Sequence, residues 1–351
     1  MALKQGGVQV DKSNLETFNA EKFVQDLLKE GSKRPCDETV QKFNENGKLP
    51  EFYDEQLYKK GQKFFTDNIF ALLYGKFLGL LTVLSIPSIV RILIYTKMSG
   101  TALTAYKRYL STVFHMVIWY QSEFTPDSKL WESVIEVKDK HNSVSKRCCN
   151  AGLGRINQKD MALTQFGFMG FALAFREKIG LHDAKDDDLR ALVHVWRVIG
   201  YVMGIEDRFN ICRDSVSETS EICRILADQI FRPAVERKDK DFIEMATHLS
   251  NGMWAMNPTL NAKIYLNLVH RLLQSSNNNQ IEFLIELNFV EKILYHFLIL
   301  VIWSLQFNVF RVYHNYTQYV SLWLMDVFPF LAYYKFGYSN SHVKVLQGKE
   351  N

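Results

Sequence analysis

Several side chains that can take part in catalysis or ligand binding lie on apolar helical segments of this sequence. The imidazoles among them are His115, His141, His194 and His296. A histidine in such a place is more often a hydrogen-bonded core residue than a ligand, but a neutral imidazole is also a common ligand of metals, including haem iron. Two arginines, Arg108 and Arg197, also lie on apolar helices, where a guanidinium group can bind a carboxylate if it is not already in a salt bridge.

The sequence lacks the motifs that identify several common enzyme classes. The sequence contains no Gly-rich phosphate loop, no GxSxG motif and no HExxH pair, which disfavours nucleotide-dependent, serine-hydrolase and zincin mechanisms. The five cysteines are odd in number and include no CxxC pair, which argues against a disulfide framework or a zinc site and favours a reducing, cytosol-facing environment. The N-terminal segment has no apolar core of a signal peptide, so we expect an intracellular protein.

Charge is spread evenly along the chain. The 42 basic and 38 acidic residues give a net charge of +4 with no concentrated basic face, so we expect no nucleic-acid partner. Helical spacing recurs without sustained apolar and polar alternation, and only seven prolines occur in 351 residues, which predicts an all-α protein. We divide it into a loosely attached polar helical arm (1–48), a main helical domain (49–275) and apolar, aromatic-rich C-terminal helices (276–351).

Two predicted helices would position several of these groups. In the helix over Thr104–Tyr120, Arg108, Thr112 and His115 form a stripe beside an apolar and aromatic face. In the helix over Asp186–Gly204, Trp196 and Gly200 share a ridge with Gly204, and glycines four residues apart allow close approach of another helix or of a flat ligand.

A third helix is predicted by INQKDMALTQFGFMGFALAF, residues 156–175. Asn157 is a suitable N-cap, and the apolar remainder predicts burial. Gly167 and Gly170 each cost about 1 kcal/mol relative to alanine inside a helix, so both require a close neighbour. Gln165 is the polar residue in the middle of this apolar run.

Two long apolar segments need to be distinguished from membrane spans. Ile69–Tyr95 contains Lys76, Arg91 and the helix-kinking Pro87, which predicts a buried or re-entrant helix pair. Ile293–Phe310 is uncharged and just long enough to span a bilayer. Because the chain that follows is rich in tyrosine and tryptophan, we expect membrane contact through 293–335. The alternative is that these residues belong to a hydrophobic core or an oligomer contact.

Several motifs together resemble one known family. They are INQKDMALTQFGF (156–168), HVWRVIGYVMGI (194–205), VKDKH (137–141), the pair Arg108 and Thr112, and the segment Leu80–Pro87. Their order and spacing resemble the family of the ER-bound oxygenase mpaB and the rubber oxygenase, or latex-clearing protein, over roughly residues 49–275. VKDKH is similar to the family's V-R-x-x-H step, in which Lys138 replaces an arginine, and the Arg108 and Thr112 pair is similar to its R-x-x-x-T motif.

The resemblance implies a globin-like helical core around haem b and oxidation of an apolar, often isoprenoid, substrate at the endoplasmic reticulum or another internal membrane. The helix that begins after Asn157 would carry the axial imidazole, but Gln165 occupies that position, and an amide is a poor haem ligand. The remaining candidates for the axial ligand are His141 or His194. Arg108 and Arg197 would bind the propionates.

The expected site therefore combines two sets of residues. The cofactor-binding set is His141, His194, Gln165, Lys138, Arg108, Arg197 and Thr112. The pocket-lining set is Met161, Phe168, Met169, Gly167, Gly170, Trp196 and Gly200. The first hypothesis is a haem-dependent oxygenase-like enzyme acting on a lipid or isoprenoid. The second is a relative that has lost the haem and binds or carries an apolar ligand, and the third is a purely structural helical protein at a membrane.

Overall fold

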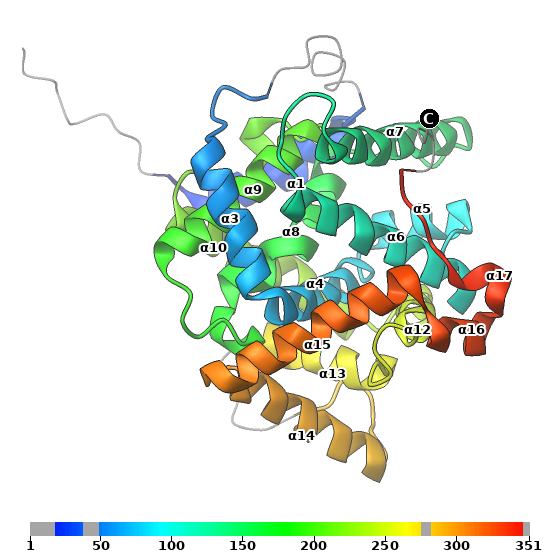
Figure 1. The fold of residues 1–351 in the computed structure, drawn as a ribbon. Helices are drawn as coiled ribbons and strands as arrows, with labels where there is room; N and C mark the ends of the chain where they lie inside the picture. The colour runs from blue at the N-terminus through cyan, green and yellow to red at the C-terminus, as the bar shows by residue number, and fades with distance from the viewer. Residues whose placement is uncertain (1–17, 38–48, 275–281, 347–351) are drawn as a thin grey trace, which may run out of the picture.

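The computed structural model describes residues 18–37, 49–274 and 282–346, and in these ranges the chain is helical and forms no strand (Figure 1). The all-α prediction is confirmed. The helices that build the fold are α1 (Ala20–Lys29), α3 (Glu55–Asp67), α4 (Ile69–Val83), α5 (Pro87–Thr96), α6 (Ala102–Gln121), α7 (Lys129–Asn150), α8 (Gln158–Ala174), α9 (Asp186–Val202), α10 (Val216–Ile225), the π-helical η5 (Leu226–Phe231), α11 (Arg232–Glu236), α12 (Lys240–Met253), α13 (Ala262–Leu273), α14 (Phe289–Ser304), α15 (Asn308–Val327), α16 (Phe330–Phe336) and α17 (Tyr338–Ser341).

Helices α4 and α8 form the centre of the core and pack directly on each other. The reason is a glycine on each side: a Cβ added to Gly79 would lie 2.1 Å from the carbonyl oxygen of Gly167. The close neighbour that Gly167 requires is therefore another helix. Gly170 instead faces the ring of Phe166 on its own helix, where an added Cβ would lie 2.3 Å from a ring carbon.

The start of α8 follows the predicted capping chemistry. The side-chain oxygen of Asn157 accepts a hydrogen bond of 2.9 Å from the backbone N–H of Asp160, so one of the free donors of the first turn is satisfied. The rest of α8 is almost entirely buried, as its apolar sequence predicts.

The described part of the N-terminal arm is firmly attached, contrary to the prediction of a loose arm. Val24 and Leu27 of α1 are fully buried, and α1 packs on α10 and α8. Its few apolar residues share one face, which is enough to fix a short amphipathic helix. Residues 1–17 and 38–48 of this arm lie outside the described residues, as does the expected boundary between residues 275 and 276.

The first long apolar segment folds as the predicted helix pair, α4 and α5, with Pro87 in the first turn of α5. The second apolar segment, Ile293–Phe310, is long enough to span a bilayer but does not form one helix: the chain bends by 114° between α14 and α15. A tight turn separates them, in which the N–H of Phe307 donates to the carbonyl of Ser304 and the Leu305 side chain is buried in the core.

The helix lengths limit which segments could cross a membrane. Among the residues that the structure describes, no single helix is both long and apolar enough to cross a bilayer. Two bent pairs, α3 with α4 and α14 with α15, meet the criteria of length and composition only when each pair is taken together. Since α4 is largely buried, α14 and α15 are the pair that presents apolar side chains to the outside.

Candidate functional site: an apolar cavity closed by the C-terminal helices

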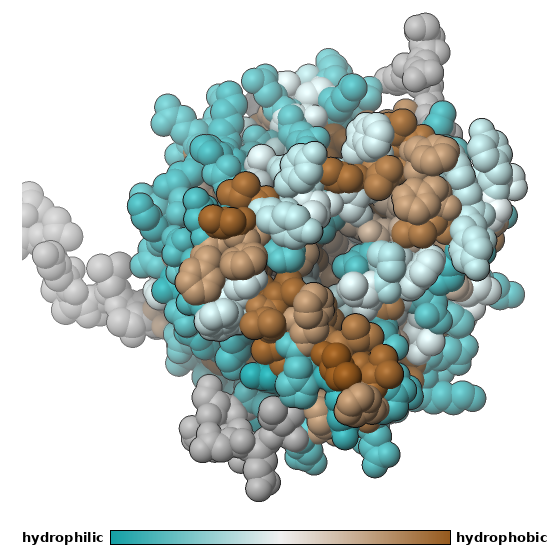
Figure 2. Space-filling model, turned by 60° about the horizontal axis from the view of Figure 1, so that its bottom comes forward, coloured by the Kyte–Doolittle hydropathy of each residue, from teal (hydrophilic) through white to brown (hydrophobic). Residues whose placement is uncertain are grey.

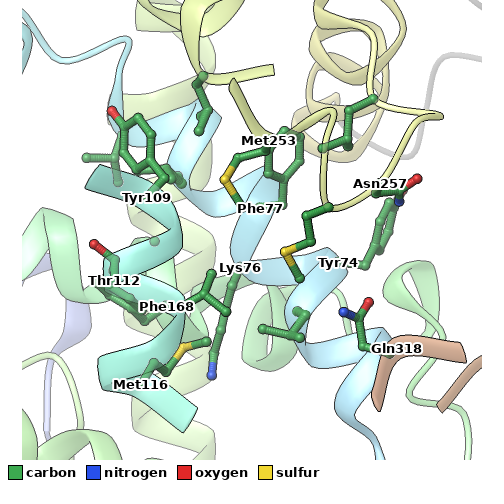
Figure 3. A pocket seen from close by; sticks show the side chains of 18 of the residues that line it. Tyr74, Lys76, Phe77, Tyr109, Thr112, Met116, Phe168, Met253, Asn257 and Gln318 are labelled. Carbon is green, nitrogen blue, oxygen red and sulfur yellow. The ribbon is translucent and has the colours of Figure 1, made fainter. Parts of the chain in front are cut away.

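A cavity of about 520 Å³ lies beside α4 and α8 (Figure 3). Its walls come from α4, α6, α7, α8, α9, α12 and α13, from the loop 256–260, and from the C-terminal helices α14 and α15. The volume is within the roughly 300–1,000 Å³ of small-molecule sites, and the lining is mainly aliphatic, aromatic and thioether groups. Such a cavity suits an apolar ligand.

One predicted group of residues does meet at the cavity wall, namely Arg108 and Thr112 from α6 and His141 from α7. The Thr112 hydroxyl donates to the Arg108 carbonyl over 3.1 Å, one turn back along α6. The Arg108 guanidinium forms no ion pair with any carboxylate in the described part of the chain. It is therefore available to an anionic group of a ligand.

His141 is a half-buried residue whose imidazole is kept neutral. Its Nδ1 is shielded from solvent and has no hydrogen-bond partner among the described residues. Burial lowers the pKa of His141 to about 4, and the positive charges of Arg108 and Lys140 act in the same direction. A neutral imidazole with an unused nitrogen is the form that binds a metal ion.

His115 completes the predicted stripe on α6 and also lines the cavity. Its Nδ1 lies 2.8 Å from the Ser133 hydroxyl, which also accepts a hydrogen bond of 2.9 Å from Trp119 Nε1. Its Nε2 lies 3.7 Å from a carboxylate oxygen of Glu136. Burial lowers the pKa of His115 to about 4 despite that carboxylate. His115 is therefore a positioned core histidine at the edge of the site.

Gln165 lines the cavity, but its amide group is held by neighbouring helices. Nε2 donates to the Trp196 carbonyl over 2.8 Å and to Asn210 Oδ1 over 3.0 Å. Gly200 makes room for this amide, because a Cβ at that position would lie 2.4 Å from Nε2. The glutamine thus joins α8 to α9 and to the segment that follows α9, and only its buried Oε1 has no partner among the described residues.

The other predicted pocket residues divide into two groups. Met161, Gly167, Phe168, Trp196 and Gly200 line the cavity. Those that do not line it are Met169, Gly170 and Lys138. Lys138 is fully buried on α7, and burial lowers the pKa of its amine to about 8.

His194 and Arg197 belong to α9 but do not line the cavity. His194 Nε2 accepts a hydrogen bond of 3.0 Å from the backbone N–H of Asp54, at the start of α3, and its ring stacks on Tyr53. The Arg197 guanidinium pairs with Asp207 at 3.1 Å and also with Asp214. Both side chains therefore have structural partners. His296 is exposed on α14.

Two features of the cavity were not predicted from the sequence. One is Lys76 of α4, whose side chain lies among the lining residues in Figure 3. Its signal was present, since it is the charged residue that interrupts an apolar segment. The other is the wall formed by Phe297, Val301 and Gln318 of the C-terminal helices, which no local pattern connects with α6 or α8.

The outer surface of α14 and α15 is unusually apolar. Figure 2 looks at the side of the molecule on which these helices lie in Figure 1, and hydrophobic side chains cover much of it. We call this surface the apolar face; its exposed residues include Phe289, Val290, Ile293, Phe297, Leu300, Trp303, Phe307, Val309, Phe310, Val312, Tyr313, Tyr316, Trp323 and Val327. Phe297 is 52% exposed and also lines the cavity, so the apolar face and the cavity are continuous.

Residues 62–277 match the family model described as ER-bound oxygenase mpaB/B′ and rubber oxygenase, catalytic domain. The chain belongs to this oxygenase family. The solved structure of latex clearing protein in the closed state is similar in fold, with a TM-score of 0.56 and 15% sequence identity over 81% of this chain and 79% of that chain. No curated protein matches the sequence.

The family match divides the cavity into two parts. The matched residues include α6, α7, α8 and α9, which carry Arg108, Thr112, His141 and Gln165. Helices α14 and α15 follow the matched residues and close the other side. The globin-like helical core that the resemblance implied is thus accompanied by a wall from helices that follow the residues matched by the family model.

Proposed function

We propose that the protein is a haem-dependent oxygenase that acts on an apolar substrate such as a lipid or an isoprenoid. The observation that carries this proposal is the position of His141, a neutral imidazole with a free nitrogen beside an apolar cavity, within the residues that match the oxygenase family. Gln165 is not required as a ligand, because its amide already joins α8 to α9.

The residues around the cavity fit a haem group. His141 would bind the iron, and the unpaired guanidinium of Arg108 would bind a propionate. The aromatic side chains of Phe168 and Trp196, which stack on each other with ring centroids 4.6 Å apart, offer an apolar surface to the macrocycle. When bound, haem would supply the activation of dioxygen.

The chain's own contribution is to bind the substrate and to exclude water. The lining of leucine, methionine and aromatic side chains favours an apolar chain over a polar one. The hydrogen bonds of Gln165 hold α8 and α9 in a fixed relation, so that the lining groups of these two helices keep their positions while the ligand binds.

We also infer that the apolar face rests on a membrane and that the substrate enters from it. Between Lys292 and Arg311 the chain carries no charge, and the face presents tryptophan and tyrosine rings of the kind enriched at membrane interfaces. An exposed apolar patch of this extent marks a protein or membrane contact in most soluble proteins. Because Phe297 belongs to both the face and the cavity, an apolar molecule can pass between them without crossing water.

The second candidate function is that of a carrier for an apolar ligand without haem. It is favoured by the apolar lining of the cavity, which can bind a lipid chain without a cofactor. In this case His141 and Arg108 would bind a polar head group. The two candidates differ in whether the protein takes up haem, and not in the location of the site.

The deciding experiment is an absorption spectrum of protein purified from a haem-replete host. We expect a Soret band that is lost in His141→Ala and retained in His194→Ala, since His194 has a structural partner in Asp54. A colourless wild-type protein would contradict the haem proposal, and a copurified lipid found in it by mass spectrometry would favour the carrier. Retention of the band in His141→Ala would show that another residue binds the iron.

A further inference from the structure

Lys76 stands in the cavity without an acidic partner. It lies on α4, is buried, and forms no ion pair with any carboxylate among the described residues. The hydrogen-bond partner seen for its Nζ is the Tyr120 hydroxyl at 3.2 Å. A buried lysine is normally paired or reaches solvent, so this arrangement requires an explanation.

Aromatic rings take the place of a carboxylate around this amine. Nζ lies 4.4 Å from the ring centroid of Phe65, 4.4 Å from that of Tyr120 and 5.1 Å from that of Trp196. Ring faces attract a positive charge but compensate the loss of hydration only in part. Burial holds the pKa of Lys76 well below its usual value, so the neutral amine, which is nucleophilic, forms at lower pH than in an exposed lysine.

The Tyr120 oxygen accepts hydrogen bonds from both Lys76 Nζ and the Trp196 indole. An indole N–H can only donate, so Trp196 Nε1, at 2.7 Å, donates to the Tyr120 oxygen. Burial raises the pKa of Tyr120, so its hydroxyl keeps its hydrogen. When the Lys76 amine is neutral, the Tyr120 hydrogen can instead be donated to the lone pair of the Lys76 nitrogen, because the two atoms lie within hydrogen-bond distance. Lys76 thus has a proton donor beside it.

We propose that Lys76 forms an imine with an aldehyde at the end of an apolar molecule bound in the cavity. The Lys76 nitrogen attacks the carbonyl carbon and forms a C–N bond. The carbonyl oxygen then leaves as water, taking both amine hydrogens, and Tyr120 relays protons between nitrogen and oxygen. The sum is one aldehyde plus one amine giving one imine plus one water, with no oxidation or reduction.

The surroundings fit the product as well as the reactants. The neutral imine that this step forms would lie against the same three aromatic rings, which surround the Lys76 nitrogen with apolar surface. The chain of the aldehyde would extend along the apolar lining from α6 and α8. A polar aldehyde would lose its hydration without gaining these contacts, so the site selects long-chain aldehydes. This inference goes beyond the oxygenase proposal and does not depend on haem.

The test is to trap the imine in the full-length protein with decanal and sodium cyanoborohydride. Reduction leaves a secondary amine, and the protein gains the mass of decanal less one oxygen atom. We expect peptide mapping to place the main adduct on Lys76 at equimolar decanal, and Lys76→Met to lose it. The matched control is Lys138→Met, which removes a buried amine of lowered pKa that does not line the cavity and should leave the adduct in place.

If Lys76→Met fails to fold, labelling of the wild-type protein alone still tests whether Lys76 forms the imine. In one sample, Lys76 should be labelled by decanal in preference to Lys138 and to exposed lysines, and an excess of decane should suppress only the Lys76 adduct. Glycolaldehyde should show no preference for Lys76. Labelling of exposed lysines with Lys76 left unmodified would overturn the proposal, whatever the absorption spectrum of the protein.

Discussion

The side chain of Gln165 occupies the space that the missing side chain of Gly200 leaves open. The Gln165 amide nitrogen reaches the Trp196 carbonyl at 2.8 Å by passing over Gly200, where a Cβ would come within 2.4 Å of it. The two residues are 35 positions apart in the sequence yet form one contact between α8 and α9. The glutamine in the apolar run and the glycine in the next helix therefore have a common explanation.

Replacement of Gln165 by leucine should destabilise the protein without removing a bound cofactor. The substitution removes two buried hydrogen bonds and leaves Asn210 and the Trp196 carbonyl less well satisfied, at a cost of about 1–3 kcal/mol in the free energy of unfolding. Urea denaturation measures this loss. If the variant lost its Soret band at unchanged stability, Gln165 would be part of the haem site instead.

Replacement of Gly200 by alanine should also destabilise the protein, by about 1–3 kcal/mol, because the added methyl group overlaps the Gln165 amide. In a Gln165→Ala background the same substitution should cost less, since the overlap is relieved, and a double-mutant cycle measures this coupling. Gly100→Ala is the matched control, since an added Cβ there meets its nearest atom only at 4.0 Å. Additive losses in the cycle would refute the proposed contact.

The stability of the protein should fall as the pH is lowered from 7 to 5, in part because of His115. Its pKa is lowered from 6.5 to about 4 in the folded state, so over this range the unfolded chain binds a proton that the folded chain does not. This difference in proton binding lowers the free energy of unfolding by roughly 2 kcal/mol between pH 7 and pH 5. Urea denaturation at several pH values should show a shallower pH dependence for His115→Gln. Identical slopes for variant and wild type would contradict the assignment.

A charge placed on the apolar face should weaken binding to lipid vesicles. Leu300 and Val309 are 55% and 78% exposed, so Leu300→Asp and Val309→Asp should fold normally. In a vesicle flotation assay we expect each substitution to lower the bound fraction. The partition constant should fall about tenfold for every 1.4 kcal/mol of transfer free energy that is lost. Met98→Asp is the matched control, because Met98 is 53% exposed but lies outside the apolar face. Equal binding by all three variants would exclude this face as the membrane contact.

Much of the helical framework follows from local chemistry and could be predicted. Asn157 caps α8, Pro87 opens α5, and the stripe of Arg108, Thr112 and His115 on α6 faces the cavity because residues three and four apart share one side of a helix. These features are encoded within one or two helical turns, where side-chain types and spacing are sufficient.

The unpredicted features all depend on contacts between distant segments. The partner of His194 is the start of α3, more than a hundred residues away, and no helical pattern distinguishes it from His141. The turn at Leu305 interrupts an apolar run in which neither proline nor glycine signals a break. The same limit applies to Lys76, because its aromatic neighbours come from α3, α6 and α9.

The cavity is assembled from two stretches of sequence, one within and one beyond the residues that match the family model. The residues suited to chemistry belong to the part that matches the oxygenase family, whereas Phe297, Val301 and Gln318 come from helices beyond it. Substitutions in the C-terminal helices would therefore reshape the cavity without touching the helices that carry Arg108, Thr112 and His141.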